Sequence, residues 1–197
     1  MKFLVVGSTG LIGSYVAKTL SKHGTVIGVS RTTQISVDVK DPASIKAMYE
    51  KVGKVDAVAS CIGKVAFKPV AELTYEDYLM GLKDKALGQV ELVRVGIDFL
   101  NDAGSFTLMT GVLARDPIPS GSVAALANGA IESFTLAAAI DLPRGIRINT
   151  VSPNVLVEAT SYHASFPGFH QVTAQSVADA YVKSILGKQT GQIYKLD

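Results

Sequence analysis

Uninterrupted apolar runs alternate with segments of helical periodicity along this chain. Residues 3–6 (FLVV) are all apolar, which is typical of a central parallel strand whose two faces are both covered. Residues 11–23 then place apolar side chains at helical spacing, and Gly24 follows them. The pattern therefore predicts that the chain begins with a buried strand, a short turn and an amphipathic helix.

The same alternation continues to the last residues. Further strands are predicted at residues 25–30, 35–39, 55–60, 105–109, 146–151 and 192–196. Helices are predicted at residues 43–52, 74–100, 122–142 and 173–186, and a polar and aromatic loop at residues 153–170. Strands that alternate with helices predict an α/β fold. We expect a Rossmann-like, doubly wound parallel sheet of about seven strands, with helices on both faces and right-handed crossovers.

Composition limits the classes of protein to which the chain can belong. Its 197 residues, 48% hydrophobic and 18% charged, suffice for one well-buried domain and are few for two, so we expect a single domain over residues 1–197. The net charge of +2, without a block of like charges, argues against a nucleic-acid partner and leaves small molecules as the expected partners. The single cysteine cannot form a disulfide framework.

No segment resembles a secretion signal or a membrane span. The N-terminus passes directly into a strand and a glycine turn, without a small-residue cleavage site. The longest apolar tract, around residues 134–140, lies between Glu132 and Asp141 and is too short to cross a bilayer. We therefore expect a cytoplasmic protein without a membrane partner.

Glycines recur at every third residue after the first strand. Gly7 would allow a tight turn, Gly10 would let the backbone approach a pyrophosphate, and Gly13 would let the helix pack closely on the strand. The helix N-terminus also offers unpaired N–H groups and a positive dipole end, which favour a phosphate. The turn therefore predicts a dinucleotide site, although a tight turn that binds nothing could share this spacing. The predicted contacts are Gly7, Ser8, Thr9, Gly10, Leu11, Ile12 and Gly13.

The residues after the second strand bear on the choice of cofactor. An acidic residue at this point would bind the adenosine ribose hydroxyls, but Ser30 and Arg31 stand there instead. Because a guanidinium suits a 2′-phosphate, NADP(H) is favoured over NAD(H). The alternative is that Arg31 is an ordinary solvated loop residue.

The strand predicted at residues 55–60 ends in Ser60, and the next residues turn away at the carboxyl edge of the sheet. Open parallel sheets bind ligands at this edge, so Ser60, Cys61, Ile62 and Gly63 are expected near the cofactor. We expect Cys61 to be a small buried residue rather than a nucleophile, because no nearby histidine could form a thiolate with it.

These segments together resemble the short-chain dehydrogenase/reductase family along nearly the whole chain. GSTGLIG (residues 7–13) resembles its glycine motif, Asp38-Val39 its adenine-contacting aspartate, and residues 60–63 its NNAG motif. Residues 147–154 resemble the strand and turn beside the nicotinamide, and residues 190–193 resemble the family's final strand. The resemblance implies a nicotinamide cofactor, for which Arg31 favours NADP(H), and a homodimer or homotetramer assembled through the two long helices. It adds the cofactor contacts Asp38, Val39, Pro153, Asn154 and Val155.

The active centre departs from the family pattern. Typical members use a Ser, a Tyr and a Lys four residues after the Tyr, supported by an Asn. By resemblance, Gly111 holds the Ser position (Thr110 if the alignment shifts by one), Ala124 the Tyr position and Asn128 the Lys position. An alanine has no proton to donate, so the usual general acid is missing.

The family's Asn position falls on Lys85, so the Asn and the Lys are exchanged between the two long helices. If the reversed pair acts, the Lys85 amine should lie within hydrogen-bonding reach of the Asn128 amide or of the nicotinamide ribose. Lys85, Asn128 and Thr110 are then the predicted catalytic residues. The alternative is that Lys85 is a solvated helix lysine and Asn128 a tolerated replacement. Other candidates for the missing acid are Tyr162, His163, Thr110 and Ser122.

These residues leave two functional hypotheses open. The first is an NADP(H)-dependent oxidoreductase that acts on a small carbonyl or alcohol with this altered catalytic set. The second, favoured by the loss of both Tyr and Lys, is a non-catalytic NADP(H)-binding sensor or regulatory protein. Neither includes a metal, because His23 and His170 have no ligand-spaced partner.

Apolar residues spread around the helix at 122–142 beyond one core-facing stripe, which predicts that a partner copy covers some of them.

Overall fold

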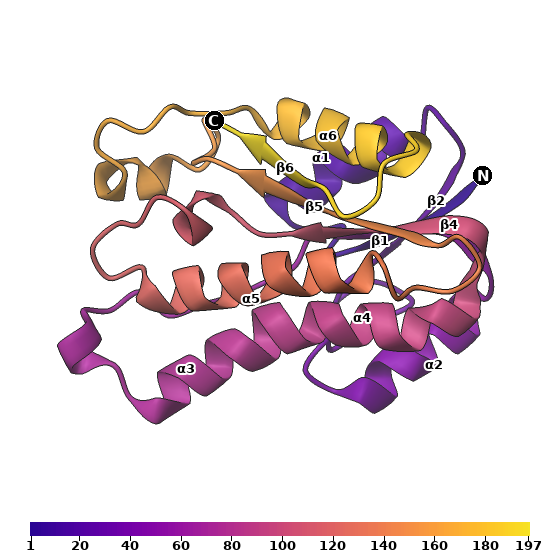
Figure 1. The fold of residues 1–197 in the computed structure, drawn as a ribbon, viewed down its shortest axis with the longest axis horizontal. Coiled ribbons are helices and arrows are strands. Elements are labelled where there is room, and N and C mark those ends of the chain that lie inside the picture. The colour runs from indigo at the N-terminus through magenta and orange to yellow at the C-terminus, as the bar shows by residue number, and fades with distance from the viewer.

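The computed structural model describes residues 1–197, whose six strands form one sheet (Figure 1). All neighbouring strands run parallel, in the order β2-β1-β3-β4-β5-β6. This confirms the predicted Rossmann-like, doubly wound α/β fold, with six strands where about seven were expected. The strands are β1 (Lys2–Val6), β2 (Thr25–Val29), β3 (Val55–Ser60), β4 (Leu100–Met109), β5 (Arg147–Pro153) and β6 (Ile193–Leu196).

The strand predicted at residues 35–39 is the one that does not form. Only an isolated bridge between Ser30 and Ser36 remains of it. The Asp38 N–H donates to the Ser44 hydroxyl (2.9 Å) and the Lys40 N–H to the Asp38 carboxylate (3.0 Å). A side chain thus takes up the Asp38 N–H that a strand would have to pair with a neighbour, and the chain turns at Lys40, so the segment stays a loop.

Helices cover both faces of the sheet (Figure 1). The helices α1 (Leu11–Leu20) and α6 (Ala174–Leu186) lie on one face, and α2 (Pro42–Val52), α4 (Gly88–Gly96) and α5 (Ser122–Ala138) lie on the other. In β1, Phe3 and Val5 belong to the apolar cluster under α1 and α6, whereas Leu4 and Val6 belong to the cluster under α2, α4 and α5. Burial on both faces explains why the first strand shows no alternation of apolar and polar residues.

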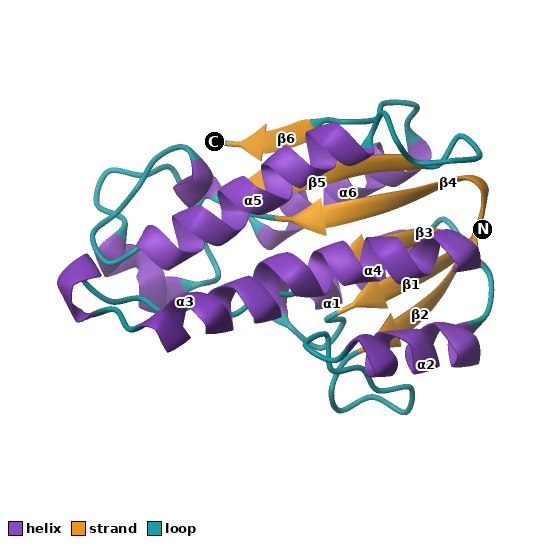
Figure 2. Cartoon of the chain, turned by 60° about the horizontal axis from the view of Figure 1, so that its bottom comes forward, coloured by secondary structure: helices purple, strands orange, loops and turns teal.

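The helix predicted at residues 74–100 is broken into several segments. It consists of α3 (Tyr75–Gly81), a π-helical segment (Leu82–Leu87), α4 and a 3₁₀ turn (Ile97–Phe99), after which β4 begins. Figure 2 shows α3 and α4 continuing one another alongside α5. The π-helical segment carries Lys85, whose stem lies so close to Gly63 that a Cβ atom at Gly63 would be 2.4 Å from the Lys85 Cγ.

The helix predicted at residues 122–142 ends earlier, at Ala138. Beyond it, the N–H groups of Ile140 and Asp141 bond to carbonyls three residues back, so the chain tightens into turns before β5. No helix is both long and apolar enough to span a bilayer.

Candidate cofactor groove and apolar pocket

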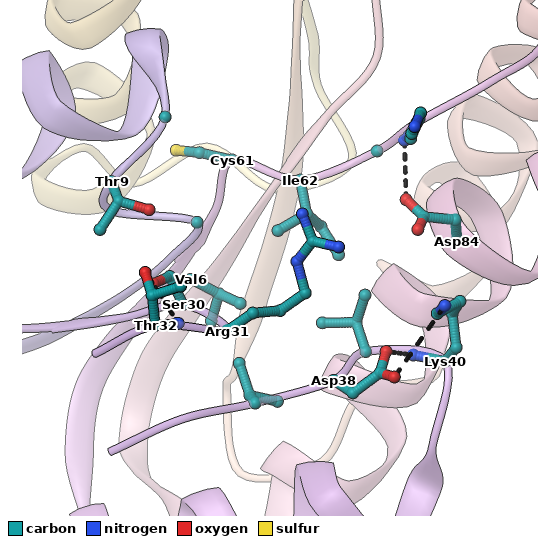
Figure 3. A pocket seen from close by; sticks show the side chains of 16 residues that line it. Val6, Thr9, Ser30, Arg31, Thr32, Asp38, Lys40, Cys61, Ile62 and Asp84 are labelled. Carbon is teal, nitrogen blue, oxygen red and sulfur yellow. Dashed lines mark hydrogen bonds and ion pairs between the residues drawn. The ribbon is translucent and has the colours of Figure 1, made fainter. Parts of the chain in front are cut away.

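A groove of about 380 Å³ lies at the carboxyl ends of β1, β2 and β3 (Figure 3). The strand β1 has β2 on one side and β3 on the other, so the groove sits where the order of the strands reverses. Ligands of open parallel sheets bind at such a point. We call it the cofactor groove. Its lining residues are Val6, Gly7, Thr9, Gly10, Ser30, Arg31, Thr32, Val37, Asp38, Val39, Lys40, Cys61, Ile62, Gly63, Lys64 and Asp84.

Backbone geometry at the glycine turn requires the absence of side chains. Gly7 has a φ of +86°, and a Cβ atom on it would lie 2.6 Å from the Cys61 carbonyl oxygen. A Cβ atom on Gly13 would lie only 2.0 Å from the Gly7 carbonyl oxygen. Gly10 caps α1 without a side-chain hydrogen bond, which leaves the first N–H groups of the helix available for an anion.

Four of the predicted cofactor contacts do not line the groove or the pocket described below. The Ser8 hydroxyl is 3.4 Å from the Val29 carbonyl oxygen, and Leu11 is largely exposed at the start of α1. Gly13 and Ser60 are buried, Gly13 where α1 packs closely on the glycine turn and Ser60 at the end of β3.

Arg31 forms the cationic end of the groove. Its guanidinium has no ion pair within the chain, and Figure 3 shows its side chain extending across the groove toward Ile62. Two carboxylates line the groove: that of Asp38 faces Lys40 at 4.0 Å and also accepts the Lys40 N–H, and that of Asp84 accepts the Lys64 N–H (2.7 Å). The hydroxyls of Ser30 and Thr32 lie 3.2 Å apart at the same end. Thr32 and Lys40 were not predicted from the sequence, since both lie in loops without a motif.

Cys61 lies in the groove as a neutral thiol. Burial raises its pKa to about 12, so it carries no charge at neutral pH. Its backbone N–H donates to the Val6 carbonyl (2.8 Å) and continues the pairing of β3 with β1. Cys61 therefore packs against the ligand site and does not serve as a nucleophile.

A second pocket, of about 230 Å³, shares Gly63 with the cofactor groove. We call it the apolar pocket because most of its lining side chains are hydrophobic. It brings together all three predicted catalytic residues from three separate segments of the chain. Its lining residues are Ile12, Gly63, Val65, Phe67, Lys85, Thr110, Gly111, Val112, Leu113, Ala124, Asn128, Pro153, Asn154, Val155, Leu156, Ala159, Tyr162 and Phe166.

Lys85 and Asn128 line the same pocket without bonding to each other. The Asn128 amide donates to the Gly111 carbonyl (3.3 Å), and its Oδ1 is buried without a partner. No hydrogen bond or ion pair of the chain involves the Lys85 amine, so the first predicted alternative, a bond to the Asn128 amide, does not form in the protein without ligand. The second alternative, a bond to the nicotinamide ribose, stays a prediction. Burial lowers the pKa of Lys85 to about 8. The site thus holds a free donor and a free acceptor.

Thr110 is engaged elsewhere. Its hydroxyl donates to Glu132 Oε1 (2.9 Å), which also accepts the Ser152 hydroxyl (2.9 Å). Arg115 in turn donates to the Ser152 hydroxyl (2.8 Å) and pairs with Asp197. This network was not predicted from the sequence. The position of Glu132, one helical turn after Asn128, is the only signal that could have placed it near the site.

The other candidates for the missing acid differ in position. Tyr162, in the short helix Thr160–Ser165, lines the apolar pocket but is 49% exposed, and its ring tilts against Phe67 at 6.2 Å between centroids. His163 bonds through Nε2 to the Leu156 carbonyl (2.9 Å). The Ser122 hydroxyl is buried outside the pocket. No cluster of His, Cys, Asp or Glu side chains forms a metal site in the structure.

Comparisons with known structures agree with this architecture over the full chain. The protein lin1944 of Listeria innocua is 49% identical, with 100% of both chains covered and a TM-score of 0.98. A small-chain dehydrogenase crystallised in complex with NADPH is 27% identical, and the match covers 100% of this chain and 96% of that one, with a TM-score of 0.89.

Curated relatives are more distant. Hydroxynaphthalene reductase arp2 of Aspergillus fumigatus is 25% identical over 175 residues, which is 76% of this chain and 64% of that protein. Tetrahydroxynaphthalene reductase of Pyricularia oryzae is 27% identical over 187 residues, which is 82% of this chain and 66% of that protein. The chain thus spans about two thirds of the length of these relatives.

A family model described as Enoyl-(Acyl carrier protein) reductase matches residues 10–191, which is most of the chain. This match begins within the glycine turn and ends just before β6, so it spans nearly all of the segment that carries the sequence resemblance. On these grounds the chain belongs to the short-chain dehydrogenase/reductase family.

Proposed function

We propose that this protein is an NADP(H)-dependent oxidoreductase that interconverts a small carbonyl compound and its alcohol, with Lys85 and Asn128 in its active site. The observation that carries the proposal is the junction at Gly63 of a groove suited to a dinucleotide and an apolar pocket with an unpaired amine. The relatives include reductases and a dehydrogenase in complex with NADPH. The family to which the chain belongs binds nicotinamide cofactors.

The residues of the groove fit such a cofactor. The uncapped N-terminus of α1 would receive the pyrophosphate, and Asp38 with Val39 would contact the adenine. Arg31 is an unpaired cation beside two hydroxyls, which suits a 2′-phosphate. The nicotinamide would reach the apolar pocket along the segment that contains Pro153, Asn154 and Val155, and its reduced form supplies a hydride there.

The residues of the apolar pocket would orient the reactants. The pocket is lined mostly by hydrophobic side chains, so it would favour an apolar substrate that its few polar groups orient. The buried Asn128 Oδ1 has no partner and would accept a hydrogen bond from the cofactor or from an ammonium group. Lys85 can donate to an oxygen atom that enters the pocket.

A second function is favoured by one observation: Ala124, which by resemblance stands at the Tyr position, lines the pocket and carries no proton donor. The protein would then bind NADP(H) as a sensor without turnover. Oxidation of NADPH with a panel of apolar aldehydes, ketones and quinones separates the two functions. Turnover supports the oxidoreductase, whereas tight NADPH binding without turnover of any compound supports the sensor and contradicts our proposal.

The cofactor preference gives a prediction of its own. Replacing Arg31 with alanine removes the unpaired cation, so NADPH should bind about 10- to 100-fold more weakly while NADH affinity stays within about twofold. Fluorescence titration of both nucleotides measures the ratio. Lys46→Ala, which removes an exposed cation on α2, is the control and should change neither affinity. An unchanged NADPH/NADH ratio in Arg31→Ala would refute the 2′-phosphate assignment.

We also propose a homodimer or homotetramer built on α4 and α5. Exposed apolar side chains run along the outer side of α5 at helical spacing and continue just beyond it: Leu126, Ala130, Leu136, Ala137 and Ile140. Light scattering should give a multiple of 20.7 kDa for the wild type. Leu126→Glu should lower the measured mass, because a charge would be buried at the interface. Leu186→Glu, on α6 across the sheet, is the matched control. A monomeric wild type at micromolar concentration would contradict the proposal.

A further inference from the structure

We propose that Lys85 is the proton donor of the reaction: its ammonium group gives a proton to the oxygen of a carbonyl substrate in the apolar pocket. The inference rests on the proposed function, because it assigns the proton that carbonyl reduction requires. It gives Lys85 a role in addition to any contact that its positive charge makes with the cofactor.

The position of the amine supports this role. Lys85 is the only charged residue among those that line the apolar pocket, and no protein group pairs with it. Its stem is confined by Gly63, where even a Cβ atom would lie 2.4 Å from the Lys85 Cγ. The residue also lies in a π-helical segment, a geometry often found at functional sites. The chain therefore directs a solitary amine into a pocket of mostly apolar side chains.

The titratable groups around Lys85 are occupied or poorly placed to compete. The Asp84 carboxylate accepts the backbone N–H of Lys64 (2.7 Å) in the neighbouring groove. On the other side of the pocket, Glu132 accepts two hydroxyls, one of them that of Thr110.

Three further groups come from the surrounding loops. Cys61 stays protonated, because burial raises its pKa to about 12. His163 bonds to a backbone carbonyl, and Tyr162 is half exposed. Tyr162 is thus the only competing donor in the pocket.

The reduction balances when the reduced nicotinamide supplies the hydride and Lys85 supplies the proton. The carbonyl carbon gains the hydride, the carbonyl oxygen gains a proton from the Lys85 ammonium, and the C=O bond becomes a C–OH group. The neutral amine is then reprotonated from water. Burial lowers the pKa of Lys85 to about 8, close to the working pH at which a general acid is most effective.

The test compares variants that keep or remove the transferable proton. Lys85→Arg keeps the charge but cannot release a proton near neutral pH, so kcat should fall about 10²- to 10⁴-fold while the Kd for NADPH changes less than about fivefold. The kcat of Lys85→Met should fall to the same extent. Lys83→Arg, at an exposed lysine of the same π-helical segment, should match the wild type. The wild-type kcat should fall as pH rises above about 8, because only the protonated amine acts.

A second measurement needs neither cofactor nor turnover. Competitive acetylation with trace acetic anhydride, followed by peptide mass spectrometry, reports the free-amine fraction of each lysine as a function of pH. The reactivity of Lys85 should level off above about pH 8, whereas that of a solvated lysine keeps rising toward about pH 10. Lys83 serves as the solvated comparison within the same protein.

The outcomes separate the two proposals. Turnover that persists in Lys85→Arg but is lost in Tyr162→Phe would overturn the role of Lys85 and leave the oxidoreductase proposal intact. Acetylation of Lys85 with the pH dependence of Lys83 would also overturn it. A wild type that binds NADPH without reducing any carbonyl compound would contradict the proposed function itself.

Discussion

Replacing Gly13 with alanine should lower the free energy of unfolding by about 3 kcal/mol and the affinity for NADPH at least about tenfold. The new Cβ atom would lie 2.0 Å from the Gly7 carbonyl oxygen and 2.7 Å from its carbonyl carbon. Both are backbone atoms of the glycine turn, so no side-chain rotation can relieve the clash. Either α1 moves away from β1 or the turn opens, and both changes displace the N–H groups that would bind the pyrophosphate.

Calorimetry without ligand and fluorescence titration with NADPH measure the two effects. For a chain of this length, 3 kcal/mol corresponds to a melting temperature lower by about 6–12 °C. Gly129→Ala is the matched control, because a Cβ atom at this position in α5 meets no atom within 4 Å. Alanine there should raise stability by about 0.5–1 kcal/mol through helix propensity. A Gly13→Ala variant that binds NADPH like the wild type would show that the turn does not hold the cofactor.

Substitutions at positions 85 and 128 should have the second large effect, a loss of affinity for NADPH that exchanging the two residues partly restores. Lys85→Asn removes the amine from the apolar pocket, and Asn128→Lys adds an ammonium next to the one already present. Each change alone should weaken NADPH binding by about 10-fold or more, the second because two like charges share one pocket. The double variant restores one amine and one amide in the reversed arrangement, so it should bind NADPH better than either single variant.

Titration of the four proteins with NADPH gives the coupling free energy of the two positions. Two residues that share a site typically have a coupling free energy of about 0.5–3 kcal/mol. The side chains of Lys85 and Asn128 do not bond to each other in the protein without ligand. Their effects on binding can still be coupled, because a cofactor between them would contact both. Effects that add within about 0.5 kcal/mol would mean that Lys85 and Asn128 act independently.

Features that depend on residues close together in the sequence were predicted well from the sequence alone. The apolar run of β1, the glycine turn and the start of α1 at Leu11 depend on backbone propensities and on a hydrophobic pattern that any buried parallel strand must have. The same local reasoning failed at residues 35–39, because the hydroxyl of Ser44 takes up the Asp38 N–H that a strand would use. The break in the long helix at the π-helical segment Leu82–Leu87 had no signal in the sequence either.

The sequence by itself therefore determined the doubly wound α/β class, the glycine turn and the presence of Lys85, Thr110 and Asn128 at positions of interest, whereas the order of the strands came from the structure. Only the tertiary structure decided what those side chains can do. It places Lys85 in the apolar pocket without a partner, turns the Thr110 hydroxyl toward Glu132 and leaves the Asn128 Oδ1 free. These outcomes depend on contacts between segments far apart in the chain, whose burial and hydrogen bonding no local pattern specifies.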